Sequence, residues 1–398
     1  MPGGMLGPPY VSAAGRAKMA GYQYSGRDLS LYYRHVQSPL CDRLVRGLPR
    51  WLAPNAITLA GLACTACATA AMLGHSAGLR GEPGRHPWVY YLQAACHIAY
   101  QTLDNMDGKQ ARRTGNASPL GLLFDHGIDA VNYTLMDLGC LTVMQMGGTW
   151  GALVLTIAGS MGFYAATWEQ MFSGTFTLTA INAPNEGILV ICLISVLAPH
   201  QDPGWWEQVD LPWLGWRRNE AVAMGILGSS VFVVLGNVWN VYKCDYRRKK
   251  LKLPFWRTVR PLAEYVGYSA LVAGWASWTG LLAAHPVLVV WVLGFFLARS
   301  VSVLMSYHIC QEEGAFIANP SVLPLVQTTF LPALLIPASL CLRDAFGAEL
   351  VDTSTLLAMV LLNGLMFAHC AYHLIDEFCS NLGIRCFRVK PQKTVHYA

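Results

Sequence analysis

Ten apolar stretches, most of them about 20 residues long, recur along this chain of 398 residues. A stretch of that length can cross a bilayer as a helix, because a helix satisfies its own backbone hydrogen bonds inside the hydrocarbon. Apolar residues make up 54% of the chain and charged residues only 13%, a balance that excludes an ordinary soluble domain and gives no reason to expect a nucleic-acid partner. We therefore predict an all-α polytopic membrane protein with about ten transmembrane helices. The expected spans are residues 55–73, 87–106, 121–146, 150–170, 186–199, 220–242, 261–284, 286–306, 321–342 and 354–377.

Five prolines stand at expected starts of these helices. A proline in the first turn costs a helix little, because the N–H that it lacks would have no partner there. Residues 1–54 contain no apolar core of a cleaved signal peptide, so we expect an N-terminal arm followed by a helix that serves as its own insertion signal. The five prolines are Pro54, Pro87, Pro261, Pro286 and Pro320.

Positive charge is distributed unevenly between the two sides of the expected membrane. Lys and Arg favour cytosolic loops. If the N-terminus is cytosolic, 22 of the 28 Lys and Arg residues lie on the cytosolic side, five lie opposite, and Arg299 lies inside a span. We therefore expect both termini in the cytosol. The most basic loop, 243–260, is expected to set this topology, with binding to anionic lipid head groups as the alternative. The tryptophan-rich loop 202–218 is expected at the opposite interface.

The twelve cysteines lie mostly inside apolar stretches. Cys64 and Cys67 form a C-x-x-C sequence within an expected span, and no second pair lies nearby in the chain. We expect them to contribute to packing rather than to a zinc site or a disulfide framework.

Four aspartates interrupt the apolar sequence around the turn between the second and third expected spans. Asp104 and Asp107 are three residues apart, and Asp125 and Asp129 are four apart, so each pair shares one face of a helix. The sequence RTGNASPLG between the pairs favours a turn. We therefore expect two antiparallel neighbouring helices whose carboxylates converge near their cytosolic ends.

These carboxylates predict a metal site. Four carboxylates in a partly desolvated site cannot all stay ionised unaided. Oxygen ligands without cysteine favour Mg²⁺ or Mn²⁺ over zinc, and two such ions about 4 Å apart commonly clamp a phosphoryl group. The alternative is a set of solvated helix-end carboxylates paired with the basic residues of 109–113. The expected ligands of two ions are Asp104, Asp107, Asp125 and Asp129.

The residues between the aspartate pairs suit phosphate chemistry. Gly108 and Ala111 are small enough for a bulky ligand to approach the helix backbone. Arg112 can bind a phosphate with two hydrogen bonds. Gly121 lies one turn before Asp125 and leaves room on the same face.

This pattern resembles the signature of the CDP-alcohol phosphotransferases, and every fixed position of that signature is filled. The resemblance extends to LAPNAITLAG (52–61), WEQMFSGTFTL (168–178) and the ten-span layout, which are similar to the eukaryotic choline and ethanolamine phosphotransferases. The signature positions are Asp104, Asp107, Gly108, Ala111, Arg112, Gly121, Asp125 and Asp129.

The resemblance implies an enzyme that transfers phosphocholine or phosphoethanolamine from CDP-choline or CDP-ethanolamine to diacylglycerol and releases CMP. It implies metal binding by the first three aspartates and a role as ligand or base for Asp129. It also implies that His126 is the base and, less directly, that Glu186 orients it. The residues implied to line the CDP site are Gly108, Ala111, Arg112 and Gly121.

Elementary chemistry favours His126 over Asp129 as the base. The ordinary pKa of histidine lies near neutrality, whereas a carboxylate bound to a cation is a poor base. Glu186 would stabilise the imidazolium. A structural role at a helix end is the alternative for His126. Asn55, which follows Pro54, either contacts the nucleotide or simply starts a helix.

The resemblance also implies a domain organisation and a location. Residues 1–54 form a cytosolic arm, 55–200 the catalytic helices, 201–378 additional transmembrane helices and 379–398 a cytosolic tail. The charge distribution implies an active site open to the cytosol, and relatives imply an endoplasmic reticulum or Golgi membrane and a homodimer. The preference between choline and ethanolamine stays open.

Other polar residues in the expected spans carry weaker signals. His369 and His373 have metal-ligand spacing and precede Asp376 and Glu377, but we expect packing roles. Arg299 either faces the site or extends towards the membrane surface.

Two other functions use acidic residues in membranes. An intramembrane prenyltransferase also binds Mg²⁺ through aspartate motifs, but its motifs usually lie far apart in the chain. A divalent-cation transporter would place acidic residues at mid-membrane on several helices. The adjacent motifs here favour the phosphotransferase.

Overall fold

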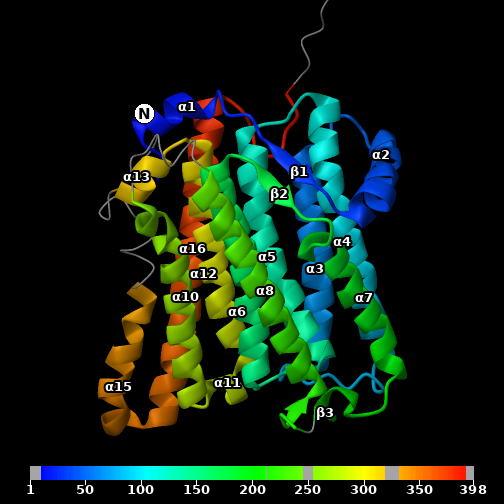
Figure 1. Cartoon of the computed structure of the whole chain (residues 1–398), viewed down its shortest axis with the longest axis vertical. Helices are drawn as coiled ribbons and strands as arrows, with labels where there is room; N and C mark the ends of the chain where they lie inside the picture. Colours follow the sequence, from blue (N-terminus) through cyan, green and yellow to red (C-terminus); the bar gives the residue numbers. More distant parts are fainter. Residues whose placement is uncertain (1–9, 212, 245–253, 319–330, 391–398) are drawn as a thin grey trace, which may run out of the picture.

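The computed structural model describes residues 10–211, 213–244, 254–318 and 331–390. Long helices run side by side along the molecule, and short strands lie towards its two ends (Figure 1). The long helices are α3 (Pro54–His75), α4 (Pro87–Thr114), α5 (Pro119–Val143), α6 (Trp150–Ser173), α8 (Arg218–Lys243), α10 (Phe255–Trp278), α12 (Pro286–Ile309) and α16 (Ala348–Leu382). The shorter ones are α1 (Ala13–Met19), α2 (Ser38–Gly47), α7 (Ile188–Leu197), α11 (Leu281–Ala284), α13 (Glu313–Ala318) and α15 (Leu335–Phe346).

The fold is that of a helical membrane protein. Six helical segments in the described ranges are long and apolar enough to cross a bilayer. α4 and α5 run alongside them in the bundle (Figure 1). The six segments are Pro54–His75, Trp150–Ser173, Ala183–His200, Arg218–Lys243, Pro286–Ile309 and Ala348–Leu382.

The boundary of α4 agrees with the predicted turn, and one other helix start differs from the sequence prediction. α4 continues past its apolar stretch to Thr114, so the first aspartate pair lies inside a continuous helix, as its spacing predicts. Pro261 was expected to start a helix but lies inside α10, which begins at Phe255. An interior proline costs a backbone hydrogen bond, and burial of Pro261 and the next residues against the bundle outweighs that cost. Pro320 and most of the expected span 321–342 fall outside the described residues.

The connection between α4 and α5 is short and its caps follow from the sequence. Gly115 ends α4 with φ at +67°, a left-handed conformation that glycine adopts without strain. The Ser118 side chain accepts a hydrogen bond from the Gly121 N–H, and Pro119 occupies the first turn of α5. The two helices are therefore antiparallel, as predicted, and α3 packs against both.

α12 forms the centre of the bundle. In the most apolar segment of α12, 78% of the residues are buried, whereas in that of α8 only 11% are buried. Aromatic rings join α12 to its neighbours, with Tyr268 of α10 and Phe296 of α12 4.1 Å apart between centroids. Tyr164 of α6 stacks on Tyr265 of α10 at 4.5 Å. Apolar side chains on α8 and α16 are consequently exposed, which suits contact with lipid.

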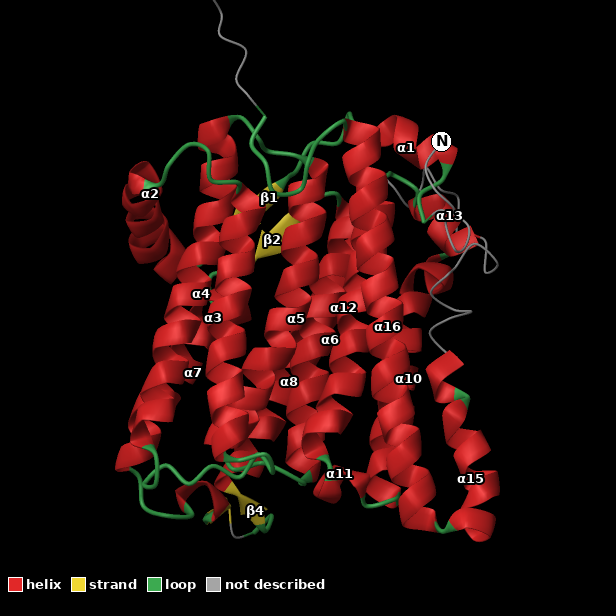
Figure 2. Cartoon of the chain, turned by 180° about the vertical axis from the view of Figure 1, so that it is seen from behind, coloured by secondary structure: helices red, strands yellow, loops and turns green. Residues whose placement is uncertain are grey.

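The segment before α3 crosses one end of the bundle. Its strand β1 (Gly26–Asp28) pairs in parallel with β2 (Phe176–Leu178), which follows α6. The turn between α4 and α5 and the described ends of the chain lie at this same end (Figures 1 and 2). At the other end, β3 (Val209–Leu211) and β4 (Trp216–Arg217) form an antiparallel pair. The N-terminal arm is thus placed directly above the acidic helices.

Candidate metal centre

The four aspartates converge between α4 and α5. Carboxylate oxygens of Asp104, Asp107 and Asp125 lie within 4.8 Å of one another. Ligand atoms of Asp125, His126 and Asp129 form a second such group with the same limit. Asp107 and His126 are buried, and the other three residues are partly buried. The two groups share Asp125, so the pairs seen in the sequence build one continuous centre.

Two hydroxyl groups fix the orientation of these carboxylates. Thr58 of α3 donates a hydrogen bond to Asp107. Tyr100, one turn before Asp104, donates to the Asp129 carboxylate at 2.7 Å. One oxygen of Asp104 and one of Asp125 are buried without any hydrogen-bond partner. Buried carboxylate oxygens that lack partners are costly, and a hard divalent cation bound by such oxygens removes that cost. The donor set therefore fits Mg²⁺ or Mn²⁺.

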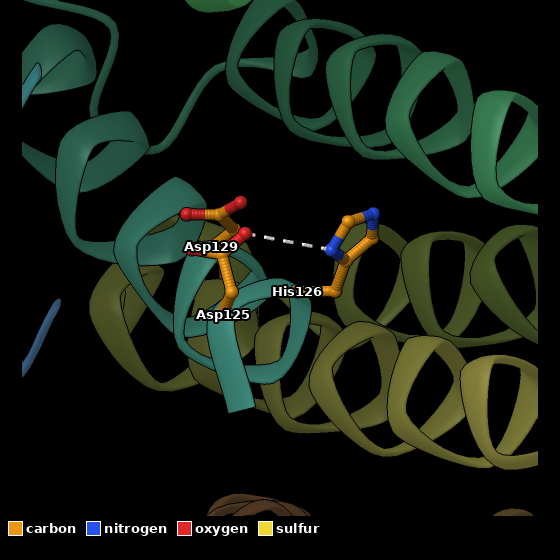
Figure 3. Close-up of side chains that lie close together, drawn as sticks. All are labelled: Asp125, His126 and Asp129. Atoms are coloured by element: carbon orange, nitrogen blue, oxygen red, sulfur yellow. Dashed lines mark ion pairs between the residues drawn. The ribbon is translucent and has the colours of Figure 1, made fainter. Parts of the chain in front are cut away.

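His126 lies beside this centre rather than within the apolar core. Its Nδ1 is 3.7 Å from an Asp125 oxygen, and the other ring nitrogen lies on the opposite side of the ring (Figure 3). Phe176 of β2 contacts the ring edge to face, with centroids 5.5 Å apart. The imidazole thus has one nitrogen turned towards the carboxylates and a hydrophobic cover on the side of the arm.

The basic residues near the centre are mostly engaged elsewhere. Lys109 donates to Asp42 of α2 at 2.8 Å, and Arg113 donates to the carbonyls of Val45 and Leu48. Among the described residues, neither forms an ion pair with the four aspartates. These contacts hold α2 against α4, and they extend α4 beyond its apolar part. The carboxylates therefore do not have the basic partners that the alternative sequence interpretation supposed.

Arg112 differs from its two basic neighbours. Its guanidinium folds back over Gly108, where an added Cβ would lie 3.5 Å from a guanidinium nitrogen. It also lines an open pocket of about 400 Å³ between α2 and α4. Because Gly108 has no Cβ, the Arg112 side chain can lie close to the backbone of α4 at this position.

Asn55 lies near the second aspartate helix. Its amide nitrogen donates to the carbonyl of Cys386 at 3.0 Å, and its oxygen would be 3.9 Å from a Cβ on Gly121. Asn55 is the second residue of α3, and its hydrogen bond to Cys386 links the C-terminal segment to the site. Ala111 lies on α4, and its carbonyl accepts the cap hydrogen bonds that end the helix.

Glu186 anchors the N-terminal arm. Its carboxylate accepts hydrogen bonds from the Ser30 hydroxyl at 2.6 Å, from the Tyr32 N–H at 3.3 Å and from the Asn182 N–H at 3.0 Å. In the described part of the chain, no hydrogen bond or ion pair joins Glu186 to His126. Asn185 extends the anchor by donating to Asp28 of β1 at 2.8 Å. The arm is therefore held to the turn that precedes α7.

Charged residues of the site affect the hydroxyl of Tyr24, which belongs to the arm. Its hydroxyl lies against Gly26, although about half of the residue is exposed. Burial of the hydroxyl raises the pKa of Tyr24 to about 12, the Asp125 carboxylate adds to the increase, and Arg112 opposes it. The arm thus brings an aromatic hydroxyl group close to both the acidic and the basic parts of the centre.

We expect Glu186→Ala to release the arm. Hydrogen bonds to a charged acceptor contribute roughly 1.5–3 kcal/mol, so trypsin should cut after Arg27 and Arg34 about 10-fold faster in the variant. The measurement is the initial rate of arm cleavage in detergent-solubilised protein. Ser30→Ala should have a smaller effect in the same direction. Glu207→Ala, near β3 at the other end, is the control. Equal cleavage of Glu186→Ala and the parent would contradict the anchoring role.

The weaker sequence candidates lie elsewhere. The hydroxyl of Tyr10 pairs with His369, and Glu377 accepts the N–H groups of Tyr10 and Val11. The groups that interact electrostatically with Arg299 include Tyr10, Tyr268 and Cys370. These residues join the start of the arm to α12 and α16. All twelve cysteines are free thiols, including Cys64 and Cys67.

Several residues around the centre were not identified from the sequence. Tyr100 was detectable in principle, because it lies four residues before Asp104 on the same helix face. Thr58 and Phe176 approach the aspartates or His126 from other elements, and no local spacing indicates that.

Fold and centre together define a polytopic helical membrane protein whose acidic site lies between two helices near one end of the bundle. A model of the CDP-alcohol phosphatidyltransferase family matches residues 51–214. Choline/ethanolaminephosphotransferase 1 of Arabidopsis thaliana is 32% identical, over 96% of this chain and 98% of its own length. Cholinephosphotransferase 1 of Danio rerio is 27% identical over 98% of each chain. The chain belongs to the CDP-alcohol phosphatidyltransferase family.

Proposed function

We propose that this protein transfers phosphocholine or phosphoethanolamine from CDP-choline or CDP-ethanolamine to the free hydroxyl of diacylglycerol, forming phosphatidylcholine or phosphatidylethanolamine and releasing CMP. The observation that carries the proposal is the complete family signature, with Asp104, Asp107 and Asp125 folded to within 4.8 Å of one another. Relatives named as choline/ethanolaminephosphotransferases over nearly their full length support the choice of head groups.

The aspartates would hold the divalent cations that the reaction needs. Asp104, Asp107 and Asp125 would hold a first ion, and Asp129 would help to hold a second. When bound, Mg²⁺ or Mn²⁺ would neutralise the pyrophosphate and the charge that develops on the transferred phosphoryl group. The unpartnered buried oxygens of Asp104 and Asp125 support this assignment.

The remaining residues of the centre bind and orient the substrates and transfer a proton. Arg112 binds a phosphate oxygen of CDP, Gly108, Ala111 and Gly121 leave room for the nucleotide, and Asn55 contacts its edge. His126 accepts the proton of the diacylglycerol hydroxyl through the nitrogen that faces the carboxylates. The alcohol oxygen then bonds to the phosphorus of the head-group phosphate as the bond to CMP breaks in line. Asp129, held by Tyr100, is the second candidate for that proton.

The location of the site defines how the substrates arrive. We infer about ten transmembrane helices with both termini in the cytosol, and the position of the arm, the described chain ends and the α4–α5 turn at one end supports this. The water-soluble CDP ester then enters from the cytosol and diacylglycerol from the membrane. Residues 55–200 form the catalytic unit, and residues 201–378 complete the bundle before the tail, 379–398. From the resemblance in the signature we further propose a homodimer in the endoplasmic reticulum or Golgi membrane.

A CMP-release assay tests the proposed function. Purified protein in mixed micelles should release CMP when Mg²⁺, diacylglycerol and either CDP ester are all present. Omission of diacylglycerol or addition of EDTA should abolish release, and competition between the two CDP esters gives the head-group preference. Release that is independent of diacylglycerol, or activity with a prenyl diphosphate instead, would refute the proposal.

A further inference from the structure

The segment that follows α16 returns to the acidic centre. Gly383 ends α16 with φ at +59°, a left-handed conformation, and the Ile384 N–H donates to the Cys379 carbonyl at 3.1 Å. This cap turns the chain away from the axis of α16, and the chain then crosses the end of the bundle at which the α4–α5 turn lies (Figure 1). We call residues 383–390 the C-terminal strap.

Two hydrogen bonds fix the strap beside the aspartate helices. The amide nitrogen of Asn55, at the start of α3, donates to the Cys386 carbonyl at 3.0 Å. The Lys390 N–H donates to the side-chain oxygen of Asn116, in the α4–α5 turn, at 2.7 Å. Both contacts join the strap to segments that are distant in the sequence and that border the candidate site. The strap backbone is therefore held on either side of residue 387.

Phe387 carries the aromatic ring of the strap. Its ring meets that of Phe124 of α5 edge to face, with the centroids 5.7 Å apart and the planes at 87°. Phe124 immediately precedes Asp125, so this contact brings the strap to within one residue of a candidate metal ligand. Phe387 is nevertheless 50% exposed. A fixed and half-exposed aromatic ring leaves apolar surface in water, and a ligand that covers it gains the free energy of burying that surface.

An open space lies next to the strap, over Gly121. A Cβ added to Gly121 would meet only the side-chain oxygens of Ser118 and Asn55 within 4 Å, at 3.7 and 3.9 Å, among the described residues outside its own helix backbone and chain neighbours. Asn55 connects this space to the strap, because its amide nitrogen is the group that binds the Cys386 carbonyl. The room above Gly121 and the ring of Phe387 thus border the same edge of the centre.

The charge of the strap indicates what kind of ligand this edge suits. The strap sequence, GIRCFRVK, has three basic residues and no acidic one. The basic side chains are all exposed, so they attract an anionic ligand rather than compensate a buried acid. A ligand that combines an aromatic ring with phosphate groups matches both the exposed ring and the charge. The basic residues are Arg385, Arg388 and Lys390.

We propose that the C-terminal strap completes the nucleotide side of the CDP site and that the cytosine ring of the CDP ester stacks on Phe387. This inference rests on the proposed function. Stacking uses the face of the base and not its hydrogen-bonding edge, so it contributes affinity and leaves the choice of base to other groups. CMP keeps the same ring, and the strap therefore binds the substrate before transfer and the product after it.

Binding of two ligands separates stacking from a structural role. Phe387→Ala should weaken Mg²⁺-dependent binding of CMP about 5–100-fold, the usual loss when an aromatic partner of a base is removed. Competition by inorganic pyrophosphate, which has no base, should change less than about twofold. Phe387→Trp should restore CMP binding. Phe346→Ala is the matched control, because Phe346 is also an exposed phenylalanine and ends α15. Equal loss for CMP and pyrophosphate, or no loss for CMP, would overturn the proposal.

A double-mutant cycle tests whether the strap positions the ring. Asn116→Ala removes the acceptor of the Lys390 N–H and should weaken CMP binding in the same direction as Phe387→Ala, by a smaller factor. In the Phe387→Ala background, Asn116→Ala should cause no further loss, because the ring that it positions is absent. Losses that multiply would contradict the strap as the support of Phe387.

Thiol labelling tests the location of the nucleotide without any turnover. The Cys386 Sγ lies 3.4 Å from the Asn55 amide nitrogen, and the thiol is partly buried. CMP with Mg²⁺ should slow its modification by a small maleimide, measured by mass spectrometry of the Cys386 peptide, whereas modification of the exposed Cys341 on α15 should not change. Unchanged labelling of Cys386 at saturating CMP would overturn the proposal. Absence of CMP release by a parent protein that still binds CMP would instead count against the proposed function.

Discussion

His126→Ala is expected to lower kcat for phosphocholine transfer by about 10²–10⁴-fold, the usual contribution of a general base, while Mg²⁺-dependent binding of CDP-choline changes little. The side chain lies 3.7 Å from Asp125, outside the three-aspartate group that would hold the first cation. Its removal therefore affects the proton transfer more than the nucleotide site. The reaction should stall with both substrates bound.

The measurements are initial rates of CMP release and calorimetric titration of CDP-choline in the presence of Mg²⁺. His97→Ala is the matched control, because His97 is also a buried imidazole, lies on α4 and is not part of either acidic group. It should retain kcat within about twofold, since it removes a ring without removing the base. Near-normal turnover of His126→Ala would exclude His126 as the base and favour Asp129.

The sequence predicts the centre well because its geometry is local. Spacings of three and four residues place each aspartate pair on one helix face, whatever the rest of the chain does. Gly115 and Ser118 then reverse the chain within a few residues. The convergence of the two pairs thus depends on helix geometry and one turn, both of which leave clear signals in the amino-acid order.

Features that depend on contacts between distant segments were missed. The contacts by which Lys109 and Arg113 hold α2 against the last turns of α4 have no signal in the sequence. The hydrogen bond between Ser30 and Glu186 joins segments that no periodicity relates. The prediction that Pro261 starts a helix was wrong, because burial of α10 against the bundle outweighs this local helix-start signal.

The arm shows most clearly what the sequence could not reveal. Residues 1–54 have no apolar span and were expected only to be a cytosolic arm. In the structure, residues 26–28 pair with β2, which also carries the Phe176 that covers His126. A β-pair of three residues has almost no sequence signature, because its stability comes from the partner strand and not from its own pattern.

Asp107→Asn is expected to weaken Mg²⁺-dependent binding of CDP-choline by at least about 100-fold and to abolish transfer, because loss of even an outer partner of a metal ligand costs 10–100-fold. The substitution preserves the volume of the side chain and an acceptor for the Thr58 hydroxyl. Only the negative charge is lost. Asp137→Asn is the matched control, since Asp137 is a buried acid of α5 that accepts from Thr156 at 2.6 Å and lies outside both acidic groups. Tight nucleotide binding by Asp107→Asn would contradict its role as a ligand.

Asp107→Asn, which is expected to abolish transfer, is expected to stabilise the fold when no metal is bound. In metal-free protein the four carboxylates repel one another, and this repulsion destabilises the fold. Asp107→Asn removes part of it and should raise the Tm measured in EDTA, whereas Mg²⁺ should stabilise the parent more than the variant. A residue that served only the fold would lower Tm in both conditions when changed. A lower Tm in EDTA would therefore show that Asp107 is a structural acid, and a higher one would show that its charge is retained for the cation despite its cost to the fold.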